Sequence, residues 1–385
     1  MTMKKILLLI TVTFISLNSI AQTVYREIDG PNGEKRQLKI QVPRNYEANT
    51  DTMYPVIVVF DGDYLFEPVS GIADYYSYWD EMPDAIVVGI NQINNKDIDF
   101  SCDEINGLPF ESGAAFFEFI TYDLFNFIDN NYRTVPFRTI VGHGESANFL
   151  NFYLFQEQPF FNAYISLSPS FTEKMALRLK EQFTDLQTPI FYSLTTAEDD
   201  RKNSRNSINA LHKSLDAISN DNFHYNYNYY KGKSHYELVN HALPTAFEKI
   251  YKAFKPIDRK EYKEKLLMYS DGNAMDYVVK KYNTIKTMYG VDKQIRINDF
   301  NAVEAALRKT EDWEAFKELG KLALDEYPDT MLGKYYMGLH YENIGEPKKA
   351  IKAYGGAFAM EEIGDLKKDD MLHYIEVIKE DFGIK

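Results

Sequence analysis

Short apolar runs alternate with longer amphipathic segments through the first two thirds of the chain. An apolar run of about four to eight residues predicts a strand, and apolar positions recurring every three or four residues predict a helix. The predicted strands are Gln37–Val42, Val56–Phe60, Ala85–Ile90, Arg138–Val141, Ala163–Leu167, Pro189–Leu194 and Phe223–Lys231. The predicted helices are Gly113–Asn131, Glu145–Phe155, Thr172–Thr184, Lys202–Ser219 and Tyr236–Phe254.

This alternation of strand and helix predicts an α/β fold with a mostly parallel sheet. Val56–Phe60 and Ala85–Ile90 are nearly continuous runs of valine and isoleucine, which is typical of strands covered on both faces. Phe223–Lys231 alternates tyrosine with asparagine and predicts a half-exposed strand. The segment Gly30–Lys35 (GPNGEK) predicts a hairpin turn. Sites in such folds lie at the carboxyl ends of the strands.

The pattern changes after Pro256, where charged segments rich in leucine and tyrosine predict helices to the end of the chain. The small and aromatic residues of one stretch have the spacing of a tetratricopeptide helix pair: Gly338, Tyr341, Ala350, Tyr354 and Ala357. A generic helical hairpin is the alternative interpretation. We expect a hydrolase-like domain over 22–257 and a helical domain over 258–385, with the tetratricopeptide-like unit at about 331–362.

The first residues have the layout of an export signal. Lys4 and Lys5 precede the mostly apolar run Ile6–Ile15, and Ser19-Ile20-Ala21 is a small-x-small cleavage site. The apolar run is too short for a comfortable transmembrane helix. We therefore expect residues 1–21 to be a signal peptide and the protein to be periplasmic or secreted in a Gram-negative bacterium, with no transmembrane segment.

Composition excludes several classes of function. The formal net charge of −14 argues against nucleic acid or an anionic membrane as the main partner. Cys102 is the single cysteine, so the chain has no internal disulfide. Neither a histidine and cysteine cluster with metal-ligand spacing nor a glycine-rich phosphate loop is present, so we expect no cofactor.

The stretch VGHGESANFL, residues 141–150, joins a predicted strand to a predicted helix. A nucleophile elbow needs this context, with a strained residue at the tip of the turn and small neighbours around it. Gly142, Ser146 and Ala147 are small enough. The residue at the tip is Gly144, which has no side chain.

Several segments resemble the enterochelin-esterase and esterase D-like family of α/β hydrolases over about 24–255. One segment ends in VGHGESA and has Ile128, Asp129, Tyr132, Arg133 and Thr134 before it. Two segments lie upstream: YPVIVVFDGDYLF, which contains Asp61 and Gly62, and VVGINQINNKDIDF. Two lie downstream: SLSPSF, which contains Ser168, Pro169 and Ser170, and GKSHYEL, which contains His235. The resemblance implies an esterase fold that acts on a small-molecule ester or a related ligand. Its helical tail also resembles that of some exported members and is a candidate surface for a protein partner.

The resemblance implies a role for each matching residue. His235 corresponds to the catalytic base and Glu198 to the acid that orients it, with Asp199 and Asp200 as close rivals. The oxyanion hole corresponds to the backbone N–H of Glu145 and to one N–H of the Asp61–Tyr64 loop, at Gly62 or Asp63.

The departure from the family is at the nucleophile, where Gly144 stands in place of serine. Glycine has no hydroxyl with which to form an acyl-enzyme. The first interpretation is therefore a pseudoenzyme that binds a ligand or a protein. The alternative is an active carboxylic-ester hydrolase, for an acylated sugar or a siderophore ester, with Ser146 and His235 as an unorthodox pair. Glu145 with His235 as a water-activating pair, and a tail that docks in an envelope assembly, are further possibilities.

Overall fold

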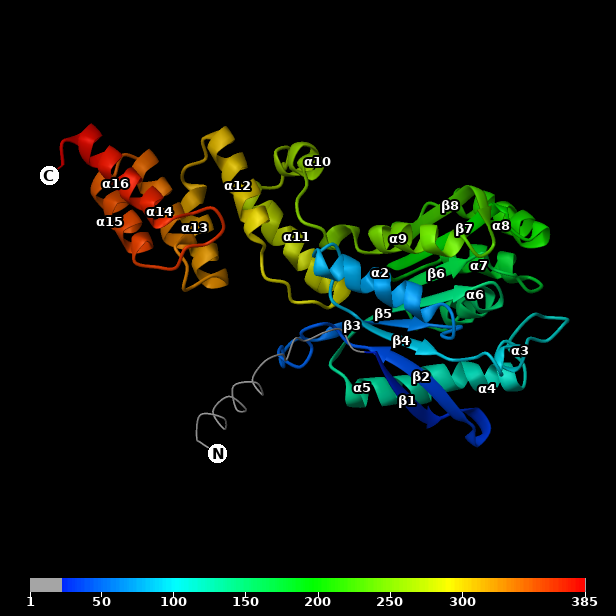
Figure 1. Cartoon of the computed structure of the whole chain (residues 1–385). Helices are drawn as coiled ribbons and strands as arrows, with labels where there is room; N and C mark the ends of the chain where they lie inside the picture. Colours follow the sequence, from blue (N-terminus) through cyan, green and yellow to red (C-terminus); the bar gives the residue numbers. More distant parts are fainter. Residues whose placement is uncertain (1–22, 385) are drawn as a thin grey trace, which may run out of the picture. The chain divides into compact units, whose positions relative to one another are not determined.

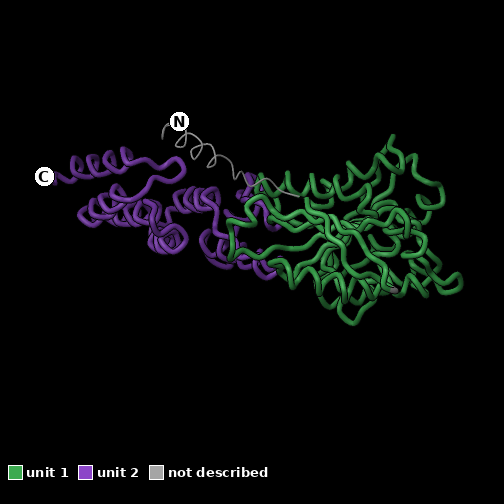
Figure 2. Tube along the Cα trace, turned by 60° about the horizontal axis from the view of Figure 1, so that its bottom comes forward, with its two compact units in different colours: residues 1–252 green, residues 253–385 purple. Residues whose placement is uncertain are grey.

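The computed structural model describes residues 23–384, which fall into two compact units, residues 1–252 and residues 253–385 (Figure 2). The expected signal peptide, residues 1–21, lies outside the described residues. Among residues 23–384, no helix has the length and apolar character needed to cross a membrane.

The first unit is built on one sheet, which has eight strands within the described residues. Their order is β1-β2-β4-β3-β5-β6-β7-β8; β1 and β2 are antiparallel to their neighbours, and the strands from β4 to β8 run parallel. The strands are β1 Thr23–Asp29, β2 Lys35–Gln41, β3 Tyr54–Val59, β4 Ile86–Ile90, β5 Thr134–His143, β6 Ala163–Leu167, β7 Ile190–Asp199 and β8 Phe223–Ser234. The predicted mostly parallel α/β fold is confirmed.

Helices cover both faces of this sheet. Helices α2 and α9 lie side by side on one face, and α4 and α5 cover the opposite face (Figure 1). The α-helices of this unit are α2 Phe66–Tyr78, α3 Lys96–Asp99, α4 Ser112–Glu118, α5 Phe125–Asn131, α6 Glu145–Phe149, α7 Met175–Thr184, α8 Lys202–Leu215 and α9 Leu238–Ile250. Shorter turns are the 3-10 helices Pro31–Gly33, Leu150–Leu154 and Lys252–Phe254 and the π-helical turn Phe119–Leu124, which joins α4 to α5.

The core between the sheet and α4–α5 is aromatic. Phe60, at the end of β3, is fully buried and packs against Phe116 and Phe149, with ring centroids 5.6 Å and 6.2 Å away. Burying rings of this size contributes several kcal/mol of hydrophobic stabilisation in total. This packing holds the ends of β3 and β5 in a fixed relation, which positions the loops that follow both strands.

The hairpin predicted at Gly30–Lys35 is confirmed, since β1 and β2 pair from Asp29 opposite Lys35. Among the strands and α-helices of this unit, β1, α2 and the four-residue α3 were not predicted. Strand β1 is mostly exposed and therefore has no apolar run. Helix α2 contains Pro68 and Gly71, which interrupt the helical pattern.

The second unit is helical. Its elements are α10 Arg259–Glu261, the π-helical turn Tyr262–Leu266, α11 Ala274–Tyr289, α12 Ile297–Thr310, α13 Ala315–Glu326, α14 Leu332–Asn343, α15 Pro347–Phe358 and α16 Lys368–Phe382. Helices α14 and α15 lie in the segment predicted to be tetratricopeptide-like; that finer assignment stays a prediction.

Helices α14 and α15 approach closely at Gly338. A Cβ at this position would lie 2.3 Å from Cε1 of Tyr354, a distance no real contact tolerates. The Tyr354 ring is fully buried, and its hydroxyl donates a hydrogen bond of 2.7 Å to Glu342 on α14. The ring therefore cannot move aside without breaking that bond.

We expect Gly338→Ala to lower the free energy of unfolding of the helical unit by about 1–3 kcal/mol, because the added methyl overpacks the helix interface. The measurement is hydrogen exchange of the α14 and α15 amides by mass spectrometry. Gly355→Ala on α15 is the matched control: no atom lies within 4 Å of its Cβ position, so the substitution should stabilise the helix by about 0.5–1 kcal/mol. Equal effects of the two substitutions would contradict this account of the interface.

Candidate functional site

The candidate site residues of the first unit lie where the parallel strands end. Asp61 follows β3, Gly144 follows β5, Ser168 follows β6, Asp200 follows β7 and His235 follows β8. Because the carboxyl ends of parallel strands meet at one edge of a sheet, side chains from distant parts of the sequence converge there.

Gly144 occupies the tip of a sharp turn between β5 and α6. Its φ of 68° and ψ of −113° lie in a region that glycine adopts readily and other residues adopt at a cost. Its N–H donates to the Leu167 carbonyl, and its carbonyl accepts from the Ser170 N–H, so β6 and its loop fix the turn. A Cβ on Gly142 would lie 2.7 Å from the Ser146 backbone, so this neighbour must be glycine. The predicted elbow geometry is confirmed.

His235 faces this tip and is held by Asp200. Nδ1 of His235 lies 2.8 Å from Oδ1 of Asp200, and both side chains are buried. A Cβ on Gly144 would meet only His235, at 3.8 Å from Nε2. The imidazole therefore points one nitrogen at the carboxylate and the other at the place where a nucleophile would stand.

Asp200 is surrounded by hydrogen-bond donors. It accepts from the Ser168 hydroxyl at 2.6 Å, the Thr196 hydroxyl at 2.7 Å and the Arg201 N–H at 2.8 Å. Burial alone would raise the pKa of Asp200, but hydrogen bonds from His235, Ser168 and Thr196 outweigh it and lower the pKa to about 2. The ionised carboxylate accepts the Nδ1 proton of His235, which leaves Nε2 free to act as a base or as a ligand contact.

Glu198, the acid expected to orient His235, does not contact it; Asp200 does. Strand β7 runs through Asp199, five residues beyond its predicted end at Leu194, so Glu198 lies on an exposed part of the strand. Its carboxylate accepts the Gly232 N–H of β8 at 2.8 Å. Asp199 is also exposed, and its backbone pairs with Ser234. Asp200 is the first residue after the strand and turns inward.

A second polar cluster lies on the other side of Gly144, around the buried carboxylate of Asp61. Oδ1 of Asp61 forms an ion pair of 2.8 Å with Lys96, and Oδ2 accepts the hydroxyl of Ser146 at 2.6 Å. The Asp61 N–H donates to Gln92 at 2.9 Å. Asp61 has a positive φ of 51°, a strained conformation that these partners hold in place.

Ser146, the alternative nucleophile, belongs to this cluster and not to that of His235. Its side chain is fully buried, its hydroxyl donates to Asp61, and its oxygen accepts the His143 N–H at 2.8 Å. A hydroxyl held this way is directed away from a ligand in the cavity. The expectation that Ser146 pairs with His235 is therefore wrong.

The expected oxyanion donors are only partly in place. Glu145 is the first residue of α6 and lines the cavity, and N–H groups at this end of a helix have no partner within the helix. The Gly62 N–H donates to the Ile90 carbonyl at 2.7 Å, and the Asp63 carboxylate accepts the Gln92 N–H. Neither Gly62 nor Asp63 lines the cavity, so the expected contribution of these two residues is not supported.

His143 forms the wall between the two clusters. Its Nε2 lies 3.1 Å from the His235 carbonyl, which can only accept, so Nε2 carries the proton. Nδ1 then accepts from the Tyr64 hydroxyl at 3.1 Å. Burial and the neighbouring His235 lower the pKa of His143 to about 4, so this ring is neutral at neutral pH.

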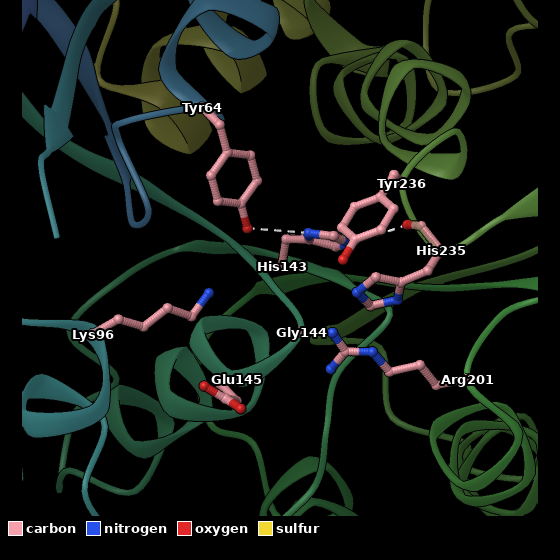
Figure 3. A pocket seen from close by; sticks show the side chains of 8 residues that line it. All are labelled: Tyr64, Lys96, His143, Gly144, Glu145, Arg201, His235 and Tyr236. Carbon is pink, nitrogen blue, oxygen red and sulfur yellow. Dashed lines mark hydrogen bonds between the residues drawn. The ribbon is translucent and has the colours of Figure 1, made fainter. Parts of the chain in front are cut away.

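The two clusters enclose a cavity of about 440 Å³ beside Gly144, a volume in the range of small-molecule sites (Figure 3). It is lined by Tyr64, Lys96, His143, Gly144, Glu145, Arg201, His235 and Tyr236. Sequence reasoning missed the roles of Lys96, Arg201 and Tyr236. Arg201 directly follows Asp200, Tyr236 directly follows His235, and Lys96 begins α3 in the polar segment after β4. These positions in the sequence were the signal from which their place at the site could have been predicted.

No group of three or more histidine, cysteine, aspartate or glutamate side chains in residues 23–384 is arranged to hold a metal ion.

Comparisons with known proteins agree with this fold. No protein-family model matches the sequence, and no curated protein matches it. Among solved structures, it is similar to an uncharacterised protein from Capnocytophaga ochracea, with a TM-score of 0.84, 26% identity and coverage of 93% of this chain and 100% of that chain. An IroE-like serine hydrolase from Shewanella oneidensis has a TM-score of 0.59 and 18% identity, with 78% and 98% coverage. A siderophore hydrolase, EstA, from Aspergillus nidulans has a TM-score of 0.50 and 16% identity, with 60% and 95% coverage.

The similarity to the two hydrolases shows the fold, which is that of the α/β hydrolases. The Capnocytophaga protein is similar over nearly the whole chain, so both units have counterparts in one other protein.

We expect His143 to make the unfolding free energy depend on pH. Its pKa in the folded protein is below its ordinary value of about 6.5, so the unfolded chain takes up the proton first as the pH falls. This contribution is present above about pH 6.5 and is lost toward pH 4; between pH 7 and pH 5 the loss is on the order of 2 kcal/mol. Urea unfolding of the wild type and His143→Gln at both pH values measures it. The same pH dependence in both proteins would show that His143 does not titrate in this way.

Proposed function

We propose that this protein is an esterase-fold pseudoenzyme that binds a small-molecule ester or a related ligand in the cavity beside Gly144. The observation that carries the proposal is the combination of a base and acid pair, His235 and Asp200, with a glycine at the position that this pair faces. Covalent catalysis needs a hydroxyl at that place. Part of the machinery for holding a carbonyl compound, the N–H of Glu145 at the start of α6, remains in place.

Other hydroxyls near the site do not replace the missing one. Ser146 is bonded to Asp61. Ser168 lies 2.9 Å from Nδ1 of His235 but is fully buried, and its hydroxyl donates to Asp200. Both serines hold a buried carboxylate in place, and neither lines the cavity.

The retained parts suit binding. His235 presents Nε2 to the cavity, and the N–H of Glu145 lies at the start of α6. The Glu145 N–H can donate to a carbonyl or carboxyl oxygen, and Nε2 can accept a hydrogen bond from a ligand or, when protonated, donate one. The tyrosine rings of Tyr64 and Tyr236 provide apolar walls for the remainder of a ligand. Selection for binding alone would preserve these features after the loss of the nucleophile.

The export signal and the helical tail supplement this proposal. The layout of residues 1–21 supports a role outside the cytoplasm. The helical unit is a candidate surface for a protein partner, on the resemblance of its segment 331–362 to a tetratricopeptide helix pair.

We expect the purified protein, residues 22–385, not to hydrolyse short-chain nitrophenyl esters above background. We expect Gly144→Ser to hydrolyse them at a rate at least about a hundredfold above that of the wild type. The space at Gly144 accepts a Cβ, with His235 Nε2 3.8 Å away, so a serine hydroxyl can reach the base. The positive φ of this residue makes the substitution cost about 1 kcal/mol or more of stability.

Gly144→Ser combined with His235→Ala, and separately with Asp200→Asn, should return activity to background. Gly144→Ala is the control for the added bulk without a hydroxyl. Turnover by the wild type that His235→Ala abolishes would show that the protein is an enzyme and would overturn the proposal.

A further inference from the structure

We propose that the ligand of this cavity is a free carboxylic acid in its anionic form, with its carboxylate in the space that Gly144 leaves beside His235. This inference rests on the proposed function and names the chemical class of its ligand. It follows from the shape of the space, from the groups that face it and from the positions of two cations.

The space beside Gly144 has the dimensions of a missing side chain. Only His235 atoms lie within 4 Å of the Cβ position, at 3.8 Å for Nε2 and 3.9 Å for Cε1. An oxygen atom of a ligand can therefore approach Nε2 to a hydrogen-bond distance of about 2.8 Å. In a serine hydrolase this volume holds the hydroxyl oxygen. Here one oxygen of a carboxylate takes that place, and the second lies toward the N–H of Glu145 at the start of α6.

Two cationic side chains enter the cavity from opposite sides. Lys96 extends from the start of α3, and Arg201 extends from the start of α8 toward Gly144 (Figure 3). The Lys96 ammonium pairs with Asp61 and has two further N–H groups to offer. Within residues 23–384 the Arg201 guanidinium forms no hydrogen bond or ion pair, and its planar fork matches a carboxylate.

His235 supports the same charge preference. When its imidazole is protonated, Nδ1 donates to Asp200 and Nε2 donates to the cavity. A bound carboxylate is a second acceptor for that form, after Asp200, and it pairs with the positive charge of the ring. A neutral ester or amide gains nothing from this second interaction, so the site distinguishes an acid from its ester.

Glu145 is the group that opposes an anion, since it is the carboxylate that lines the cavity among the described residues. Its side chain is exposed, so solvent and salt screen its charge. The buried carboxylate of Asp61 is already paired with the Lys96 ammonium. The exposed ring of Tyr236, 70% accessible, remains as a surface on which the organic part of the acid can pack.

Isothermal titration of benzoate and butyrate into 22–385, beside their neutral analogues benzamide and butyramide, tests the inference. We expect a carboxylate to bind about tenfold or more tightly than its amide, since a hydrogen bond to a charged group is worth more than one to a neutral group. Arg201→Gln should weaken carboxylate binding about tenfold without changing amide binding. Arg205→Gln, on the same helix α8 but outside the cavity lining, makes the same change of charge and should have no effect.

Gly144→Ser provides the sharpest test, because its hydroxyl fills the proposed carboxylate space. We expect it to weaken benzoate binding by about tenfold or more while it gains ester hydrolysis, so one substitution exchanges binding for turnover. Gly144→Ala should weaken binding without any turnover. Gly144→Ser that gains hydrolysis is folded, so unchanged benzoate affinity in that variant would overturn the carboxylate position.

The outcomes separate this inference from the proposed function. If amides bind as tightly as acids and Arg201→Gln has no effect, the ligand class is wrong and the binding role stands. If neither acid binds and the wild type is silent on esters, the carboxylate inference is overturned. If the wild type hydrolyses esters in a way that depends on His235, the proposed function fails as well.

Discussion

The hydrogen bond between Asp200 and His235 is the interaction on which the cavity depends. It joins the loops that follow β7 and β8, and it is buried, so water does not compete with it. The donors around Asp200 keep the carboxylate charged, and that charge decides which imidazole nitrogen carries the proton. Nε2 is thereby aimed at Gly144. Without this bond the imidazole could rotate, and the space at the elbow would lose its one polar neighbour.

Buried carboxylates also hold the hydroxyls of the two serines near the elbow. Asp61 and Asp200 lie on opposite sides of the elbow, and each accepts a hydrogen bond from one serine hydroxyl, that of Ser146 or Ser168 respectively. An ionised carboxylate in the interior is costly unless it is fully hydrogen-bonded. The two hydroxyls therefore stabilise the charges of the site. Hydroxyl chemistry at this edge of the sheet would require a side chain at the elbow itself.

Much of the fold followed from the sequence, because buried parallel strands such as β3 and β4 are continuous apolar runs. The elbow and His235 were also found, since each lies in a short motif next to a strand. The choice between Glu198 and Asp200 failed because it depends on where β7 ends. Polar threonines at 195 and 196 hid the buried last part of that strand. Lys96 and Arg201 line one cavity only in the folded chain, because the strand order that brings their segments to the same edge of the sheet cannot be read from local pattern.

The backbone angles at Gly144 favour substitution in one direction, from serine to glycine. A serine at this position holds strain of about 1–3 kcal/mol, which an active enzyme tolerates because the strained turn presents its nucleophile. Once activity is no longer selected, glycine relieves that strain, and a GGU or GGC codon differs from a serine codon by one nucleotide. The reverse change, from glycine to serine, also needs one nucleotide, but it lowers the stability of the fold. Folding alone therefore favours glycine at this position, and a serine there requires a compensating benefit such as hydrolysis.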